Sequence, residues 1–161
     1  MTILPDGREL WHTPAPDTQE VALERLTAFW QSAKTSLLIV DYSFNLVAFE
    51  TILPELKNKG VVVTLVLDKS QSTGSSEKPV IASLKASGIN MTIGESSMHH
   101  IVHDKFSVVD GIHAEYGSFN FTKVAGLEDN FFFIENNSSV AQDLTTIANS
   151  IKSWIINSEN N

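Results

Sequence analysis

Cysteine is absent from this sequence of 161 residues. Its absence excludes disulfide bonds, thiolate zinc sites and a cysteine nucleophile. Long apolar runs are absent too, since none approaches the ~20 residues that a membrane-spanning helix requires, so no stable membrane association is expected. The first residues, Met1–Asp6, lack the basic start and the apolar stretch of a secretory signal. The sequence therefore favours a cytoplasmic location, or a secreted or periplasmic one if the chain is a processed form.

Basic residues are scarce: 11 Lys and Arg stand against 19 Asp and Glu, which gives a net charge of −8. General affinity for nucleic acid rests on Lys and Arg that neutralise phosphates, so this balance argues against it. The acidic excess lies mainly in residues 1–30 and 126–161, whereas residues 31–125 carry nine acids and eight Lys. The central part is nearly neutral, and nucleic acid stays compatible with it.

What is present is the composition of a folded protein, with 42% hydrophobic residues and a length that suits one domain, 1–161. Short β-branched runs alternate with segments of helical periodicity. We expect strands at 36–43, 61–67, 89–93, 101–109, 113–117 and 130–134, a polar loop at 69–76, and helices at 17–33, 45–59, 78–87 and 139–154. Asp17 and Ser139 are the expected N-caps, and Pro54 predicts a kink or two short helices.

Strands that alternate with helices predict a sheet that is covered on both faces. The turn at Asp110-Gly111 predicts a hairpin, and therefore at least one antiparallel pair of strands. The expected fold is α/β, with a mixed β-sheet flanked by helices on both faces.

The segment from His103 to Asn120 carries most of the chemistry. If it begins as a strand, His103 and Lys105 point the same way, because residues two apart share a face. Neutral histidine is a nucleophile, and the ammonium group of lysine attracts and holds a phosphate. Ser118 and Asn120 follow Gly117, where the chain can approach a ligand closely, and both side chains can donate hydrogen bonds to phosphate oxygens. This set can act on a phosphodiester without a metal.

The spacing of these residues resembles the HKD motif of the phospholipase D superfamily. It reads His103-x-Lys105, four residues, Asp110, six residues, then Gly117-Ser118-x-Asn120. The continuation to Lys123 is similar to small bacterial endonucleases of that superfamily, which are chains of about this length with one motif each. The resemblance is carried by residues 103–123.

The resemblance implies a single phospholipase D-like catalytic domain that forms a homodimer, because sites of this superfamily contain two motifs. One His103 would attack phosphorus to give a phosphohistidine, and His103 of the partner subunit would protonate the leaving oxygen and then activate water. Lys105 and Asn120 of both subunits would bind the phosphate with help from Ser118. Asp110 would support the structure of the turn. Neither a metal nor a cofactor is implied.

The family also uses a downstream carboxylate, normally Glu before Asn, that orients the histidine ring. The matching place here reads Leu127-Glu128-Asp129-Asn130. Asp129 is therefore the first choice for this role, and Glu128 is the alternative. Lys123, and Lys69 at the start of the polar loop, are candidates for contact with substrate.

Together these residues predict a metal-independent phosphodiesterase, an endonuclease that hydrolyses DNA or RNA. A phospholipase D-type hydrolase of phospholipids or small phosphodiesters would suit the acidic chain, although no amphipathic membrane-facing segment stands out. A dimeric phosphate-binding module with weak or no catalysis would suit the altered carboxylate. A zinc site would have to use His99, His100 and His103.

Overall fold

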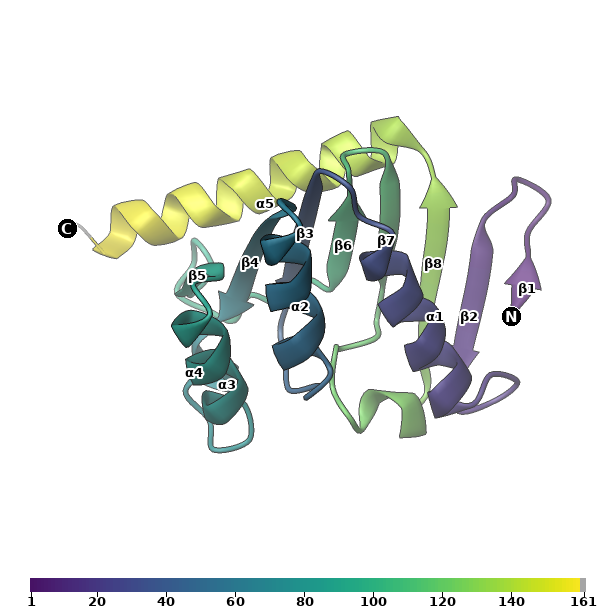
Figure 1. Cartoon of the computed structure of the whole chain (residues 1–161), viewed down its shortest axis with the longest axis horizontal. Helices are drawn as coiled ribbons and strands as arrows, with labels where there is room; N and C mark the ends of the chain where they lie inside the picture. The colour runs from purple at the N-terminus through teal and green to yellow at the C-terminus, as the bar shows by residue number, and fades with distance from the viewer. Residues whose placement is uncertain (160–161) are drawn as a thin grey trace.

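One eight-stranded mixed sheet forms the centre of the protein in a computed structural model that describes residues 1–159 (Figure 1). Its strands are β1 (Thr2–Ile3), β2 (Glu9–Thr13), β3 (Ser36–Asp41), β4 (Val62–Asp68), β5 (Asn90–Gly94), β6 (Phe106–Val109), β7 (His113–Gly117) and β8 (Asn130–Asn136). Their order across the sheet is β1-β2-β8-β7-β6-β3-β4-β5. β3, β4 and β5 are parallel, and the other neighbouring pairs are antiparallel.

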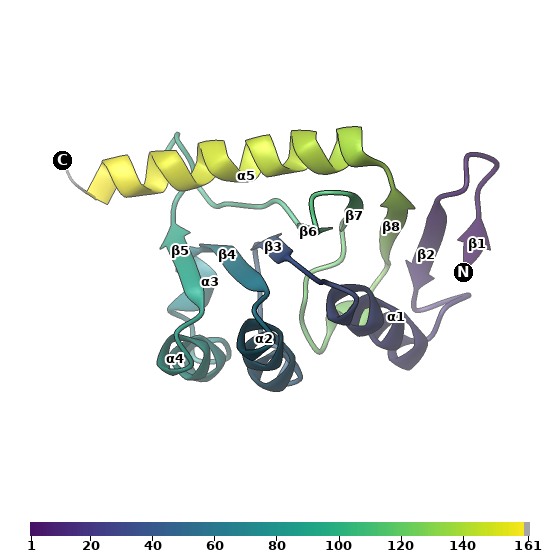
Figure 2. The same cartoon turned by 45° about the horizontal axis from the view of Figure 1, so that its top comes forward.

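Helices cover both faces of this sheet. The helical elements are α1 (Gln19–Gln31), α2 (Phe49–Asn58), α3 (Lys69–Ser72), α4 (Lys78–Ala86), the 3₁₀ turn η1 (Ala125–Leu127) and α5 (Ser138–Glu159). Figure 2 shows α1, α2 and α4 on one side of the sheet and α5 on the other. The expected α/β class, a mixed sheet flanked by helices on both faces, is confirmed.

The antiparallel pairing of β3 with β6 in the middle of the sheet brings the two halves of the chain together. Val40, at the end of β3, pairs with Phe106, at the start of β6. Phe106 in turn pairs with Tyr116, near the end of β7. The carboxyl ends of β3, β4 and β7 and the amino ends of β6 and β8 therefore meet at one edge of the sheet. We call this the site edge.

Two hydrophobic clusters hold the helices to the sheet. The larger lies under α1, α2 and α4, where the ring of Trp30 contacts Phe49 and Phe121 at centroid distances of 4.7 and 4.8 Å. The smaller lies under α5. A Cβ on Gly94 would come within 2.4 Å of the side chain of Ile155, so glycine allows α5 to pack closely on β5. Each fully buried large apolar side chain contributes about 1.5–3 kcal/mol.

The structure corrects the expected start of the motif strand. β6 begins at Phe106 rather than at 101, so His103 and Lys105 precede it. His103 is exposed and Lys105 is buried, yet the His103 ring and Lys105 Nζ both lie beside the ring of Tyr42, at 4.8 and 5.3 Å from its centroid. Residues 101–105 lie outside the sheet, because the backbone N–H of Val102 donates to the carboxylate of Asp68 (2.8 Å) instead of to a neighbouring strand.

Both expected helix caps were wrong by one or two residues. Thr18 caps α1, while Asp17 is buried and its carboxylate accepts the backbone N–H of His12. Asn137 caps α5, accepting the backbone N–H of Ser139 in place of Ser139 acting as the cap. In both cases a neighbouring polar side chain had the better geometry for the free N–H groups of the first turn.

Three elements differ from expectation. The segment 69–76 begins with the short helix α3, because the carboxylate of Asp68 accepts N–H groups of its first turn. The helix expected at 45–59 is the single helix α2, which begins at Phe49 and contains Pro54. The strands β1 and β2 were not predicted, although β2 buries Trp11 and Thr13 in alternation with exposed His12.

A buried carboxyl group lies at the centre of the sheet, beneath α1. Trp30 Nε1 donates to Ser107 Oγ (2.8 Å), and Ser107 Oγ donates to Glu115 Oε2 (2.8 Å). Glu115 is 1% exposed. Burial raises the pKa of Glu115 from 4.5 to about 8, against the lowering effect of the Ser107 hydrogen bonds. The folded protein therefore carries this carboxyl group in its neutral form at neutral pH.

This raised pKa predicts that alkaline conditions destabilise the fold. Between pH 4.5 and about 8 the folded state holds a proton that the unfolded state loses, so the free energy of unfolding falls as pH rises. The slope is about 1.4 kcal/mol per pH unit. Glu115→Gln removes this contribution and keeps an oxygen for Ser107. Urea unfolding at pH 5, 6, 7 and 8 should give the variant a flatter profile than the natural chain; parallel profiles would contradict the assignment.

Candidate active site

His103 lies at the site edge with its side chain exposed. Its ring contacts Tyr42, the residue after β3, at a centroid distance of 4.8 Å and an interplanar angle of 56°. Within residues 1–159 the ring takes part in no hydrogen bond, so both ring nitrogens can meet a ligand. The ring also borders a cleft of about 590 Å³ between the β5–β6 connection and Ile151 and Trp154 of α5.

Lys105 is buried, with 7% of its surface exposed, beneath this histidine. Its Nζ donates to the backbone carbonyl of His103 (2.6 Å) and lies 5.3 Å from the centre of the Tyr42 ring. Burial lowers the pKa of Lys105, and the carboxylates of Asp41 and Asp104 act in the opposite direction. The site therefore holds its central cation in a poorly hydrated place, where its interaction with an anion is strong.

The second arm of the motif begins at Gly117, whose backbone N–H donates to the carbonyl of Lys105 (3.3 Å). A Cβ on Gly117 would lie 2.2 Å from the carbonyl oxygen of Phe131 and 2.7 Å from the Cα of Phe132. Only glycine therefore allows β7 and β8 to approach here. This close pairing holds the residues after Gly117 beside Lys105.

Ser118 and Asn120 are placed by this close approach. The Ser118 hydroxyl donates to Asn130 Oδ1 (2.9 Å) and accepts the backbone N–H of Phe131 (3.1 Å). Asn120 Oδ1 is buried and makes no hydrogen bond within the part of the chain that the structure describes. The backbone beside Asn120 is fixed, because the N–H of Phe121 donates to Asp41 Oδ2 (2.9 Å).

Asp110 lies at the opposite end of β6 from Lys105. Its backbone has a φ of 55°, and its carboxylate accepts the backbone N–H groups of Lys34, Thr35 and Ser36 at 2.7–3.0 Å. Burial acts to raise the pKa of Asp110, but these donors outweigh it and lower the pKa to about 2. These contacts support the structural role that the resemblance implies, since they bind the hairpin to the start of β3.

The two candidate orienting carboxylates, Asp129 and Glu128, are exposed and precede β8. Asp129 adjoins Asn130, whose side chain holds Ser118 and also donates to the carbonyl of Ala125 (3.0 Å). Neither carboxylate makes a hydrogen bond to His103 within residues 1–159. Their role stays a prediction.

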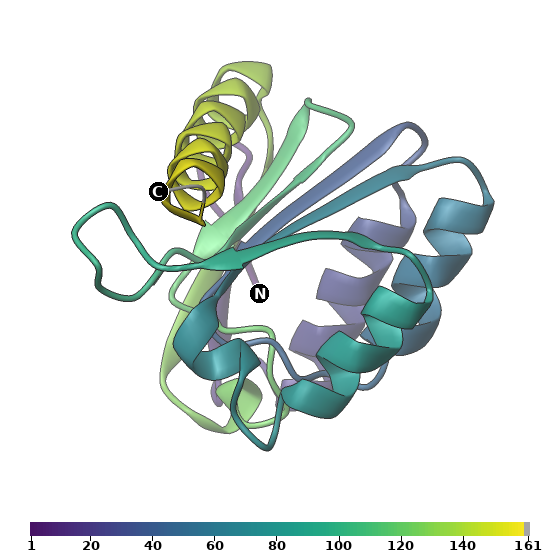
Figure 3. The same cartoon turned by 90° about the vertical axis from the view of Figure 1, so that its left-hand side faces the viewer.

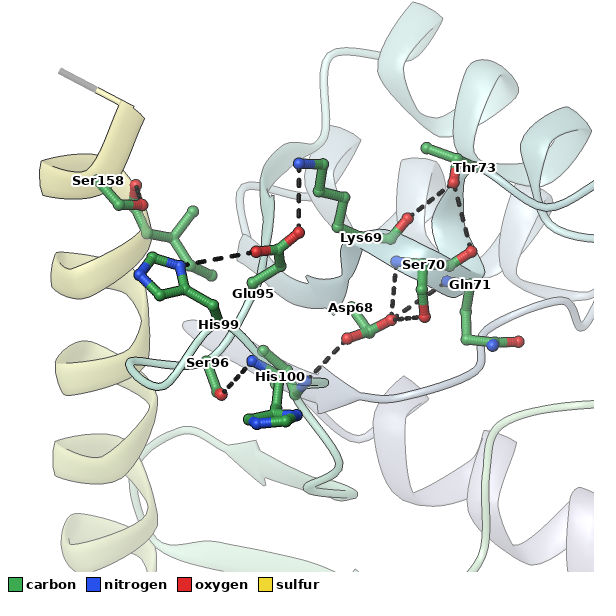
Figure 4. Close-up of polar contacts among 12 residues, drawn as sticks. Asp68, Lys69, Ser70, Gln71, Thr73, Glu95, Ser96, His99, His100 and Ser158 are labelled. Carbon is green, nitrogen blue, oxygen red and sulfur yellow. Dashed lines mark hydrogen bonds and ion pairs between the residues drawn. The ribbon is translucent and has the colours of Figure 1, made fainter. Parts of the chain in front are cut away.

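The two lysines expected to contact substrate belong to segments at the site edge. Lys69 begins α3, immediately after β4, and its Nζ lies 3.4 Å from Glu95 (Figure 4). Lys123 is exposed three residues after Asn120, with its backbone N–H held by Asn45 Oδ1 (3.2 Å). Lys123 thus lies in the segment that continues from the motif, and Lys69 lies in the segment that follows β4.

The three histidines considered for zinc do not form a metal-binding group. His99 lies 3.9 Å from Glu95 and points away from His100 toward α5 (Figure 4). Of the residues that the structure describes, no three His, Asp or Glu side chains are arranged so that they could hold a metal ion.

The sequence interpretation missed Asp41, Tyr42 and Asn130 as parts of the site. Asp41 and Tyr42 directly follow the apolar run of β3. The carboxyl ends of parallel strands are where ligands bind in α/β sheets, and this general rule could have identified them. Nothing in the sequence alone indicates that Asn130 holds Ser118.

The site edge thus combines an accessible imidazole, one buried ammonium group and the side chains of Ser118 and Asn120. An imidazole can attack an electrophilic centre or transfer a proton. The ammonium and hydrogen-bond donors can hold the oxygens of an anion. No helix of residues 1–159 is long and apolar enough to cross a membrane.

Comparison with known proteins gives consistent results. A family model described as "Cardiolipin synthase, PLD-like domain" matches residues 26–152. A mitochondrial cardiolipin hydrolase of Danio rerio is 33% identical over 112 residues, which cover 70% of this chain and 48% of that protein. The chain therefore spans about half the length of this relative.

Two solved structures resemble the whole fold. Nuc from Salmonella typhimurium, described as a phospholipase D family member, is 27% identical with a TM-score of 0.80 over 91% of this chain and 94% of its own. NucT from Helicobacter pylori is 17% identical with a TM-score of 0.78, over 89% of this chain and 94% of its own. At that identity NucT supports the fold alone.

Proposed function

Since this chain belongs to the phospholipase D-like family, we propose that it is a metal-independent phosphodiesterase, an endonuclease that hydrolyses DNA or RNA in a homodimeric site. The observation that carries the proposal is the meeting of Lys105 with the Gly117–Asn120 arm at the site edge, beside an accessible His103. This arrangement places a nucleophile next to a cation and amide donors. Those are the groups that phosphodiester hydrolysis needs.

In the proposed reaction, one His103 ring nitrogen attacks phosphorus while the bond to the leaving oxygen breaks. The leaving oxygen takes a proton from His103 of the partner subunit. That histidine, now neutral, removes a proton from water, whose oxygen attacks phosphorus and releases the first His103. Lys105, Ser118 and Asn120 bind the non-bridging oxygens throughout.

The magnitudes favour a complete site over one histidine. Uncatalysed phosphodiester hydrolysis is so slow that enzymes need acceleration on the order of 10¹⁷. Acid–base catalysis contributes only about 10²–10⁴ of this. The remainder must come from positioning and charge stabilisation, for which two copies of Lys105 and Asn120 around one phosphate are suited.

Exposed apolar side chains on the α5 side of the sheet support a second copy as the partner. Met98 and Ile101, in the β5–β6 connection that extends on this side in Figure 3, are 76% and 45% exposed. Ile147 of α5 is 45% exposed, and Phe131 beside Ser118 is 43% exposed. Phe132 points into the α1 core, so Phe131 points to the α5 side. A second copy seated here would cover them and bring its own His103 to the site.

Lys69 and Lys123 support nucleic acid as the substrate, because exposed lysines beside the site could bind phosphates next to the one that is cleaved.

A phospholipid hydrolase is the second candidate. The name of the Danio rerio relative and the net charge of −8 both favour it. The two candidates share the site and differ in the groups esterified to phosphate.

Removal of the nucleophile should abolish hydrolysis. His103→Ala is expected to reduce cleavage of plasmid DNA, single-stranded DNA or RNA in EDTA by a factor on the order of 10⁴–10⁶. The matched control is His113→Ala, since His113 lies at the far end of β7 from the site edge. Cardiolipin vesicles assayed in parallel separate the two substrates. Cleavage that strictly requires added metal, or that survives in His103→Ala, would sink the proposal.

A site shared by two subunits predicts a specific mixing result. The solution mass should be twice 17.7 kDa. When natural and His103→Ala chains are unfolded and refolded together in equal amounts, only dimers with two intact histidines should work, which leaves about one quarter of the activity. One half of the activity, or a strictly monomeric mass, would argue against the shared site.

The orienting carboxylate can be identified by comparing two variants. Asp129→Asn should lower kcat toward a chromogenic phosphodiester by a factor on the order of 10²–10⁴, as expected when a histidine loses the group that fixes its tautomer. Glu128→Gln should change it little. The opposite order would assign the role to Glu128, and two active variants would remove the role from both.

A further inference from the structure

The ring of Tyr42 contacts both functional groups of the first arm of the motif, His103 and Lys105. Its centroid lies 4.8 Å from that of the His103 ring, at an interplanar angle of 56°. Lys105 Nζ lies 5.3 Å from the same centroid, within the range of a cation–π contact. Because the imidazole takes part in no hydrogen bond within residues 1–159, its contact with the Tyr42 ring restrains its orientation.

The backbone around Tyr42 is fixed to the second arm of the motif. Asp41, the residue before Tyr42, accepts the backbone N–H of Phe121 through Oδ2 (2.9 Å). Three residues after Tyr42, the backbone N–H of Asn45 donates to the carbonyl of Phe121 (3.2 Å). Phe121 directly follows Asn120. Tyr42 therefore stands on a segment that is bound to the second arm, while its ring contacts the first.

The hydroxyl of Tyr42 is held by α3. Gln71 Nε2 donates to it at 2.9 Å. The start of α3 is anchored by Asp68, whose Oδ1 accepts the backbone N–H of Gln71 at 3.2 Å (Figure 4). The other oxygen of Asp68 accepts the backbone N–H of Val102 (2.8 Å), next to His103. This turn therefore restrains His103 twice, through the backbone before it and through the ring of Tyr42.

Building on the proposed function, we propose that Tyr42 is a positioning residue that sets the direction of the His103 ring and the place of Lys105, and that Gln71 holds Tyr42 in this role. Attack on phosphorus needs the imidazole nitrogen at about 3–3.5 Å and aligned with the bond that breaks. An imidazole that is free to rotate adopts this geometry less often. Nothing in this role requires Tyr42 to touch the substrate.

A tyrosine suits this position because its two ends do different things. The apolar ring provides the contact surface for His103 and Lys105, and the hydroxyl at its tip reaches the donor on α3. Phenylalanine would keep the ring contact and lose the anchor. Leucine would lose both, so the two substitutions separate the two parts of the role.

A double-mutant cycle tests the link from Gln71 to Tyr42. Tyr42→Phe and Gln71→Leu should each lower kcat toward a chromogenic phosphodiester by about three- to tenfold, as expected for one lost hydrogen bond, with KM unchanged. Because both remove the same bond, the double variant should be no slower than either single variant. The matched control is Tyr116→Phe, which removes a hydroxyl that bonds to Glu135 (2.7 Å) and should leave kcat unchanged.

Two kinetic results would overturn the proposal. A raised KM with unchanged kcat in Tyr42→Phe would mean that the hydroxyl binds the substrate itself. Effects of Tyr42→Phe and Gln71→Leu that multiply in the double variant would mean that the two residues act independently. Tyr42→Leu should lower kcat further, by a factor on the order of 10², as expected when a reacting group is displaced by about 1 Å.

A measurement without substrate keeps this test apart from the proposed hydrolysis. An aromatic ring shifts the NMR signals of groups beside it, so Tyr42→Leu should move the ring signals of His103, identified by their loss in His103→Ala, more than Tyr116→Leu does. Unmoved signals in folded Tyr42→Leu would contradict the contact. If Tyr42→Leu fails to fold, Gln71→Leu should move the same signals, and unmoved signals there would equally overturn the proposal. Because NMR needs no turnover, this result holds even if no phosphodiester is cleaved.

Discussion

The antiparallel pairing of β3 with β6 is the constraint on which the rest of the structure depends. It joins the parallel half of the sheet, β3 to β5, to the hairpin that carries the motif. Because Val40 pairs with Phe106, the carboxyl end of β3 lies beside Lys105. Tyr42, two residues after Val40, then lies against both the lysine and the histidine. Without this pairing His103 and Lys105 would lose their contact with the ring of Tyr42.

The sequence predicted the fold class because apolar runs and helical periodicity report burial directly. It also predicted the family, since the spacing from His103 to Asn120 depends on a hairpin of fixed length. It could not predict that residues 101–105 lie outside the sheet, because that depends on a hydrogen bond between Val102 and Asp68, which is far away in the sequence. For the same reason Asp41 was missed: its carboxylate accepts the backbone N–H of Phe121, which only the fold brings near.

The fold buries several carboxyl groups around very little positive charge. Asp41, Asp68, Glu77 and Glu115 are each 0–1% exposed, while Lys105 is the buried lysine among the described residues. Asp68 accepts backbone N–H groups, whereas burial raises the pKa values of Asp41, Glu77 and Glu115. The fold thus accommodates an acidic interior by hydrogen bonds and by protonation.

The scarcity of cations at the site has a consequence for ionic strength. Affinity for a polyanion falls with salt in proportion to the number of phosphates that are neutralised, with a slope of about 0.9 per contact on duplex DNA. Among residues 1–159, the cations that we propose to contact substrate are Lys69 and Lys123 besides the buried Lys105, so each subunit would release few counterions. Substrate binding should therefore depend weakly on salt. A protein of this design would hold its substrate by the fit of one phosphate in a preformed pocket, and would release long strands easily after each cleavage.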